Sequence, residues 1–190
     1  MSSVARGSLL LAAACAVWAQ QPQQAQRVAL SKPTIAQIRQ LKIAPQSFRD
    51  LEKRFDTRLE SLSPDPNEPV DLLGETRGIY VEGCGVIFTA AVSLVKAPEL
   101  SPFLREVPKE RADHIHKLRV DRLPLLKKAM DEMLHNMAMT YITVPPDQQI
   151  VVAVRLYYAS WESTAGMPAQ IMMRATRAGV QTGDITVEIE

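Results

Sequence analysis

The chain has 190 residues, with 22 Lys and Arg against 21 Asp and Glu and only two cysteines. This charge balance creates no field that would attract nucleic acid or anionic lipid, so the sequence argues against both as partners. The chain is long enough for one ordinary domain with a hydrophobic core, and it lacks the cysteines of a disulfide-rich scaffold.

The first 19 residues follow the pattern of a secretory signal peptide. Arg6 precedes an apolar run from Leu9 to Trp18, and the small residues Val17 and Ala19 occupy the two positions of a cleavage site. The run is about half of the ~20 residues that span a bilayer, so we expect no transmembrane helix in the mature chain. The protein is therefore predicted to be exported, either to the periplasm or into the medium.

The second feature of this segment is Cys15. The sequence of residues 12–15, AAAC, resembles the lipobox of bacterial lipoproteins, although that motif prefers Leu where this chain has Ala12. Lipid anchoring through Cys15 is therefore a less favoured alternative to simple export. If cleavage follows Ala19, Cys84 is the one remaining cysteine, and no intramolecular disulfide can form.

Residues 20–45 are predicted to form a polar linker and a short helix. The stretch QQPQQAQ lacks large apolar groups, whereas Ile35, Ile38 and Leu41 are spaced for one face of a helix. A single domain is then expected over residues 46–190. Its first element is an amphipathic helix over residues 47–62, capped by Ser47 and with an apolar stripe formed by Phe48, Leu51, Phe55, Leu59 and Leu62.

Two strands are predicted next, over residues 77–81 and 86–95. The glycines in Glu82-Gly83-Cys84-Gly85 favour a hairpin turn between them, with one long strand bent by a bulge as the alternative. A helical segment follows over residues 108–141. Pro124 is expected to split or kink it, because proline removes a backbone donor and clashes with the preceding turn.

Further strands are predicted over residues 149–159, 170–177 and 185–189. The order of elements indicates an α+β fold, with an antiparallel sheet of about five strands and amphipathic helices packed on one face. This order resembles that of roadblock and profilin-like sandwiches, a resemblance of topology that no signature motif accompanies.

Cys84 is the first candidate for chemistry. A reactive thiol needs a nearby cation, a helix N-terminus or a metal, and the neighbours of Cys84 in sequence are Glu82, glycines and apolar residues. We expect an inert thiol, with a redox or intermolecular disulfide role as an alternative. An enzyme that uses Cys84 with a histidine brought in by folding stays open, because all three histidines fall between residues 114 and 135.

Metal sites are the second possibility. His114 and His116 are two residues apart, so on a helix they point in different directions and cannot hold one ion. Helical spacing does join Asp113 to His116 and Asp131 to His135, but two ligands do not make a site. The methionines at residues 130, 133, 137 and 139 are soft ligands that suit copper. Met130, Met133 and Met137 share one helix face, a spacing that is typical of core packing, whereas Met139 points elsewhere. We therefore predict no cofactor and no metal.

Aromatic residues gather after the strongest predicted strand. Tyr157, Tyr158 and Trp161 precede or lie in the loop 160–168, and exposed aromatics on a loop are typical of recognition sites. No GxSxG, HExxH, phosphate-binding or dinucleotide-binding motif is found in the sequence.

The sequence thus favours an exported, non-catalytic binding or assembly module, which acts on an unknown protein partner or by self-association. The alternatives are a thiol-dependent enzyme that uses Cys84 and a copper- or redox-responsive periplasmic protein.

Overall fold

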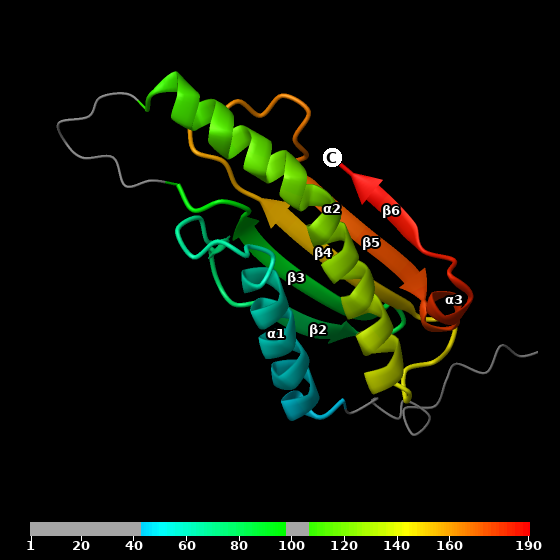
Figure 1. Cartoon of the computed structure of the whole chain (residues 1–190). Coiled ribbons are helices and arrows are strands. Elements are labelled where there is room, and N and C mark those ends of the chain that lie inside the picture. The colour runs from blue at the N-terminus through cyan, green and yellow to red at the C-terminus, as the bar shows by residue number, and fades with distance from the viewer. Residues whose placement is uncertain (1–42, 98–106) are drawn as a thin grey trace, which may run out of the picture. The chain divides into compact units, whose positions relative to one another are not determined.

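The computed structural model describes residues 43–97 and 107–190, which belong to one compact unit (Figure 1). The predicted signal peptide, Cys15 and the residues up to 42 lie outside the described part of the chain. The elements run in the order α1 (Pro45–Glu60), β1 (Asp71–Leu72), β2 (Arg77–Val81), β3 (Gly85–Ser93), α2 (Lys109–Thr140), β4 (Gln149–Leu156), β5 (Gln170–Thr176), α3 (Arg177–Thr182) and β6 (Thr186–Ile189).

The predicted α+β class is confirmed, and the sheet has six strands where about five were expected. The sheet is mixed, so the prediction that it is antiparallel is wrong. The order is β1-β3-β4-β5-β6, with β2 also paired to β3. β3 and β4 run parallel, with Val86 opposite Ile150 and Val92 opposite Leu156, and every other pair is antiparallel. The physical reason is the crossover: α2 returns the chain to the end of the sheet where β3 began, so β4 starts beside the start of β3.

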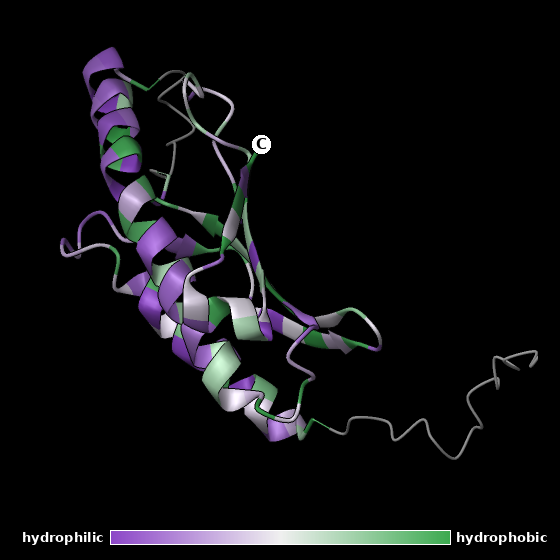
Figure 2. Ribbon diagram, turned by 90° about the vertical axis from the view of Figure 1, so that its right-hand side faces the viewer, coloured by the Kyte–Doolittle hydropathy of each residue, from purple (hydrophilic) through white to green (hydrophobic). Residues whose placement is uncertain are grey.

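Helix α2 is continuous through Pro124, so of the two predicted outcomes, a split or a kink, the split into two helices is wrong. Proline has no backbone N–H, so Pro124 cannot donate the helical hydrogen bond to the Val120 carbonyl. Val120 is 44% exposed and Pro124 is also exposed, so water can donate to this carbonyl instead. Figures 1 and 2 show α2 alongside the sheet, and α2 contacts β4, β5, α1 and α3.

Helix α1 begins two residues earlier than expected. Ala44 is its N-cap residue and Pro45 occupies its first turn, while the Ser47 hydroxyl donates to the Ala44 carbonyl instead of capping the helix. The predicted apolar stripe is confirmed, since Leu51, Phe55, Leu59 and Leu62 are buried and Phe48 packs against the core.

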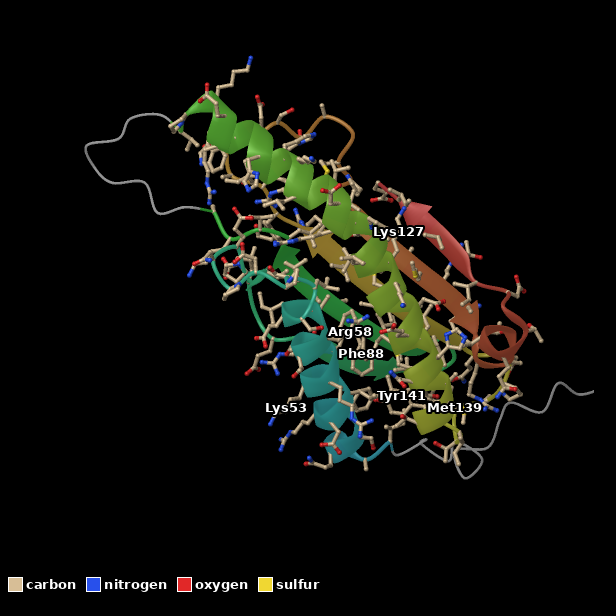
Figure 3. The ribbon with its side chains drawn as sticks, viewed as in Figure 1. Lys53, Arg58, Phe88, Lys127, Met139 and Tyr141 are labelled. Carbon is tan, nitrogen blue, oxygen red and sulfur yellow. The ribbon has the colours of Figure 1, made fainter. Side chains whose placement is uncertain are left out.

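The core lies between the helices and one set of alternate positions in the sheet. In β4, Ile150, Val152 and Val154 are fully buried, whereas Val151 and Ala153 are half-buried and Arg155 is exposed. Phe48, Phe88 and Tyr141 stack at the α1 end of the core, and Figure 3 shows Phe88 and Tyr141 close together between the helices.

The predicted hairpin is confirmed, and its turn depends on glycine. Gly83 has a φ of +78° in open space, whereas Gly85 has a φ of +129° and abuts the carbonyl oxygen of Gln149. A Cβ on Gly85 would collide with that oxygen, so only glycine lets β3 begin this close to β4.

The outer edge of β2 is covered by acidic side chains of α1. Glu52 Oε1 accepts a hydrogen bond of 2.8 Å from the backbone N–H of Gly78, and Asp56 Oδ1 accepts one of 3.1 Å from that of Thr76. Two backbone donors that β3 cannot reach are thereby paired, which protects this edge against pairing with another chain.

Candidate functional site

The carboxyl ends of the parallel strands β3 and β4 lie at the same edge of the sheet. The backbone N–H of Tyr157, just after β4, donates to the Val92 carbonyl of β3 at 2.9 Å. The loop from Tyr157 to Ala169 leaves from this point and leads into β5. In sheets with parallel strands, this end is where functional groups tend to gather.

Arg119 of α2 reaches into this end of the sheet and is 1% exposed. Its guanidinium donates to the Tyr157 carbonyl at 2.9 Å, and to Ser93 Oγ and the Val95 carbonyl at 3.0 Å each. It also donates to Glu162 Oε1 at 2.8 Å. One side chain therefore joins the helix, the ends of β3 and β4, and the loop.

Glu162 is the anionic partner that makes the burial of Arg119 possible. The Glu162 side chain is 2% exposed, and its Oε2 lies 2.6 Å from Arg119 Nε, although the two atoms are not aligned for a hydrogen bond. Burial lowers the pKa of Arg119, and the charge of Glu162 opposes this shift. Glu162 Oε1 also accepts from the backbone N–H of Ala159, which fixes the start of the loop.

The three aromatic residues of the predicted contact region have different surroundings. Tyr157 is 40% exposed and lies under the guanidinium of Arg155 at 5.3 Å. Tyr158 is half-buried, lies 5.2 Å from the guanidinium carbon of Arg119, and donates to the Pro168 carbonyl at 2.5 Å. Desolvation raises the pKa of Tyr158, so its hydroxyl stays a donor at neutral pH.

Trp161 is half-buried and sits next to Glu162 in the same loop. The loop is held again at Ser163, whose carbonyl lies 3.0 Å from His116 Nδ1 of α2. The loop 157–168 is thus attached to α2 and closed on itself through Tyr158 and Pro168, while Tyr157 and part of Trp161 face solvent. This arrangement can present a pre-shaped surface to a partner.

A second buried arginine lies one turn further along α2. Arg122 is 4% exposed and donates to the Leu94 carbonyl at 2.5 Å, to Ser63 Oγ at 2.7 Å and to the Glu68 carbonyl at 2.8 Å. Burial lowers its pKa. Glu68 Oε1 in turn lies 3.0 Å from Arg111 Nη1 and 2.9 Å from His114 Nε2. Arg122 therefore ties the connector between α1 and β1 to α2.

A groove of about 450 Å³ runs beside this second cluster. Its lining combines apolar residues with charged ones, namely Leu62, Pro64, Asp65, Glu68, His114, Leu118, Asp121, Arg122 and Leu125. Leu125 contributes apolar surface to this groove and is 44% exposed.

Cys84 lies in the turn between β2 and β3 and is an exposed free thiol. Its backbone pairs with Val81 and Gln149. The ring nitrogens of His114, His116 and His135 bond to Glu68, Ser163 and Asp131. Within residues 43–97 and 107–190, no hydrogen bond joins a histidine to Cys84.

The methionine stripe is core packing, as its spacing predicts. Met130, Met133 and Met137 are at most 3% exposed, whereas Met139 is 70% exposed at the end of α2 (Figure 3). In the described part of the chain, no group of three or more His, Cys, Asp or Glu residues is arranged to hold a metal ion. None of the helices there has both the length and the hydropathy needed to cross a bilayer.

Sequence reasoning missed Arg119, Glu162 and Arg122. The signal was present for the arginines, because Ile115, Arg119, Arg122 and Leu126 share helical spacing and all four are buried. An arginine in the core-facing stripe of a helix implies a buried partner. The partner itself, Glu162, could not be found in this way, because it lies 43 residues away in a loop.

Comparison with known proteins does not assign the chain to a family: no family model matches it, and neither a curated protein nor a solved structure does.

Proposed function

We propose that this protein is an exported, non-catalytic binding or assembly module of the cell envelope or its exterior, and that the loop 157–168 is its contact surface. The observation that carries this proposal is the buried Arg119–Glu162 pair, which fixes a loop bearing exposed aromatic surface. A loop that is ordered before binding loses little conformational entropy when a partner docks.

The arrangement of the sheet supports a second part of the proposal. In this proposal the helices cover one face of the sheet, and the other face, over which no element of residues 43–97 and 107–190 packs, receives a partner. Support comes from the alternation of buried and accessible residues in β3, β4 and β5, with Thr89, Arg155 and Arg174 exposed on the opposite side from the core. Tyr157 continues the Arg155 side of β4, so the open face and the loop form one continuous surface.

Export rests on the pattern of the first 19 residues, and it has a direct test. N-terminal sequencing of the protein from a periplasmic or culture fraction should start at Gln20. A chain that starts at Met1 in the cytoplasm contradicts export, and a lipid-modified N-terminus at Cys15 supports the anchored alternative.

The contact loop is tested with the exported chain as bait. The wild type and the variants Tyr157→Ala and Trp161→Ala are immobilised and exposed to envelope extract, with Ile142→Ala as a control because Ile142 is 69% exposed elsewhere. A partner retained by the wild type and the control, but at least about tenfold less by the loop variants, is the expected result. A partner retained equally by all four proteins contradicts the loop as the contact surface.

A thiol-dependent enzyme is the second candidate, and the exposure of Cys84 is the observation in its favour. Iodoacetamide should modify the native protein at this residue. Partner retention that is unchanged after modification fits an inert thiol, whereas a turnover activity that modification abolishes identifies the enzyme.

A further inference from the structure

The sheet has two lateral edges, and they differ in how their backbone groups are paired. At the edge formed by β2, the carboxylates of Glu52 and Asp56 accept hydrogen bonds from Gly78 and Thr76. The other edge is formed by β6, which follows β5 in the strand order and makes its extensive contacts with β5 (Figure 1). Strand addition is therefore favoured at β6 and opposed at β2.

The backbone groups of β6 that face outward can be identified from its register. Gln170 and Glu190 exchange two hydrogen bonds, of 3.1 Å and 3.0 Å, so the next bonded pairs are Met172 with Glu188 and Arg174 with Thr186. The intervening residues, Val187 and Ile189, oppose Met173 and Ile171 without bonding to them. Their N–H and C=O groups point away from β5, and within residues 43–97 and 107–190 no backbone group bonds to them, so they can pair with another strand.

The side chains of the same residues make the edge apolar on one side. Val187 is 45% exposed and Ile189 is 52% exposed, and Ile185 lies half-buried on the same side. Glu188 projects to the opposite side and pairs with Arg174 at 2.7 Å. Figure 2 shows hydrophobic and hydrophilic residues alternating along this strand near the C label.

We propose that β6 pairs with β6 of a second copy of this chain, antiparallel and across a two-fold axis at Val187, so that the two sheets become one. This proposal rests on the assembly function proposed above and names its partner. In this register Val187 faces Val187 of the second copy and exchanges two backbone hydrogen bonds with it. Ile189 faces Ile185, so six apolar side chains form one stripe across the junction.

Charge selects this register over its neighbour. A shift that centres the axis on Glu188 would place two glutamates directly opposite each other, which is destabilising. With the axis at Val187, Glu188 faces Thr186 and keeps Arg174 as its ion partner. The edge is therefore complementary to itself, which a two-fold dimer interface requires.

The test uses the purified exported chain and sedimentation equilibrium, without any envelope component. We expect a dimer at about 100 μM and a rise of about tenfold or more in Kd for Val187→Lys, which puts a charge into the apolar stripe. Val187→Pro removes the outward N–H and leaves the bonds to β5 in place, so it should also give a folded monomer. The matched control is Ile79→Lys on the covered edge, where Ile79 is 55% exposed, and it should stay dimeric.

A cross-link tests the register. In a Cys84→Ser background, Val187→Cys should form a disulfide-linked dimer under mild oxidation, because the paired Cα atoms lie about 5.5 Å apart. Ile79→Cys in the same background should stay monomeric on a non-reducing gel. A wild type that is monomeric at about 100 μM, or a dimer that Val187→Lys and Val187→Pro leave intact, overturns the proposal. Either result leaves β6 free for a different chain, and neither affects the test of the contact loop, which uses envelope extract.

Discussion

At the scale of single residues, the decisive feature is a charge pair that the core encloses. The side chains of Arg119 and Glu162 are 1% and 2% exposed. The attraction between the two charges therefore offsets the free-energy cost of removing each of them from water. The exposed pair Arg174–Glu188 has a similar N–O distance of 2.7 Å but side chains that are 49% and 38% exposed. The two pairs therefore allow a buried ion pair to be compared with an exposed one at a similar N–O distance.

We predict that Glu162→Gln lowers the free energy of unfolding by about 3–5 kcal/mol, because it leaves the Arg119 guanidinium buried without a counter-charge. Glu188→Gln should cost less than about 1 kcal/mol, since water screens that pair. Urea unfolding followed by Trp161 fluorescence measures both, because Trp161 is the one tryptophan after residue 19. Equal losses in the two variants would contradict a structural role for the buried pair.

At the scale of elements, α1 is joined to the rest of the domain by polar contacts as well as by its apolar stripe. Arg58 Nε lies 2.7 Å from Glu132 Oε2 and thus links α1 to α2, as Figure 3 shows for Arg58 between the two helices. The hydrogen bond from Arg58 lowers the pKa of Glu132. A carboxyl whose pKa is lower in the folded state than in the unfolded state stabilises the fold at any pH above its unfolded-state pKa. This stabilisation is lost as the pH falls through the folded-state pKa.

This link gives a pH-dependent prediction. At pH 7 Glu132→Gln should destabilise the protein by less than about 1 kcal/mol, because the two side chains are 38% and 40% exposed. The difference from the wild type should begin to shrink near the ordinary pKa of glutamate, about 4.3, and should vanish once the pH lies below the lowered pKa of the folded state. Urea unfolding at a series of pH values measures it, with the exposed Glu60→Gln on α1 as the control. A difference that does not shrink as the pH is lowered from about 5 to about 3 would assign the effect to packing instead.

At the scale of the whole molecule, the core carries the stability. In the described part of the chain Cys84 is a free, exposed thiol, so no disulfide constrains this unit. We predict that Cys84→Ser and the addition of a reductant each leave the thermal midpoint of the exported chain unchanged within about 1 °C, since neither touches the core. Differential scanning calorimetry checks this. A clear fall in the midpoint with reductant would reveal a disulfide between copies.

The sequence itself determined which segments are helices and which are strands. Apolar spacing located α1, the methionine face of α2 and the strands β2 to β6, because side-chain periodicity is a local property that burial enforces. It also indicated the glycine turn at residues 82–85. Short elements such as β1 and α3 were missed, since two and six residues are too few for a period to show.

Only the tertiary structure decided how distant segments meet. The parallel pairing of β3 with β4 depends on the return path of α2, and the pairing of Arg119 with Glu162 joins residues 43 positions apart. Which sheet edge is covered also depends on where α1 packs, as Glu52 and Asp56 look like ordinary solvated charges in the sequence. Local patterns record whether a side chain is buried, but a partner far along the chain is chosen by the three-dimensional packing, and no periodicity encodes that choice.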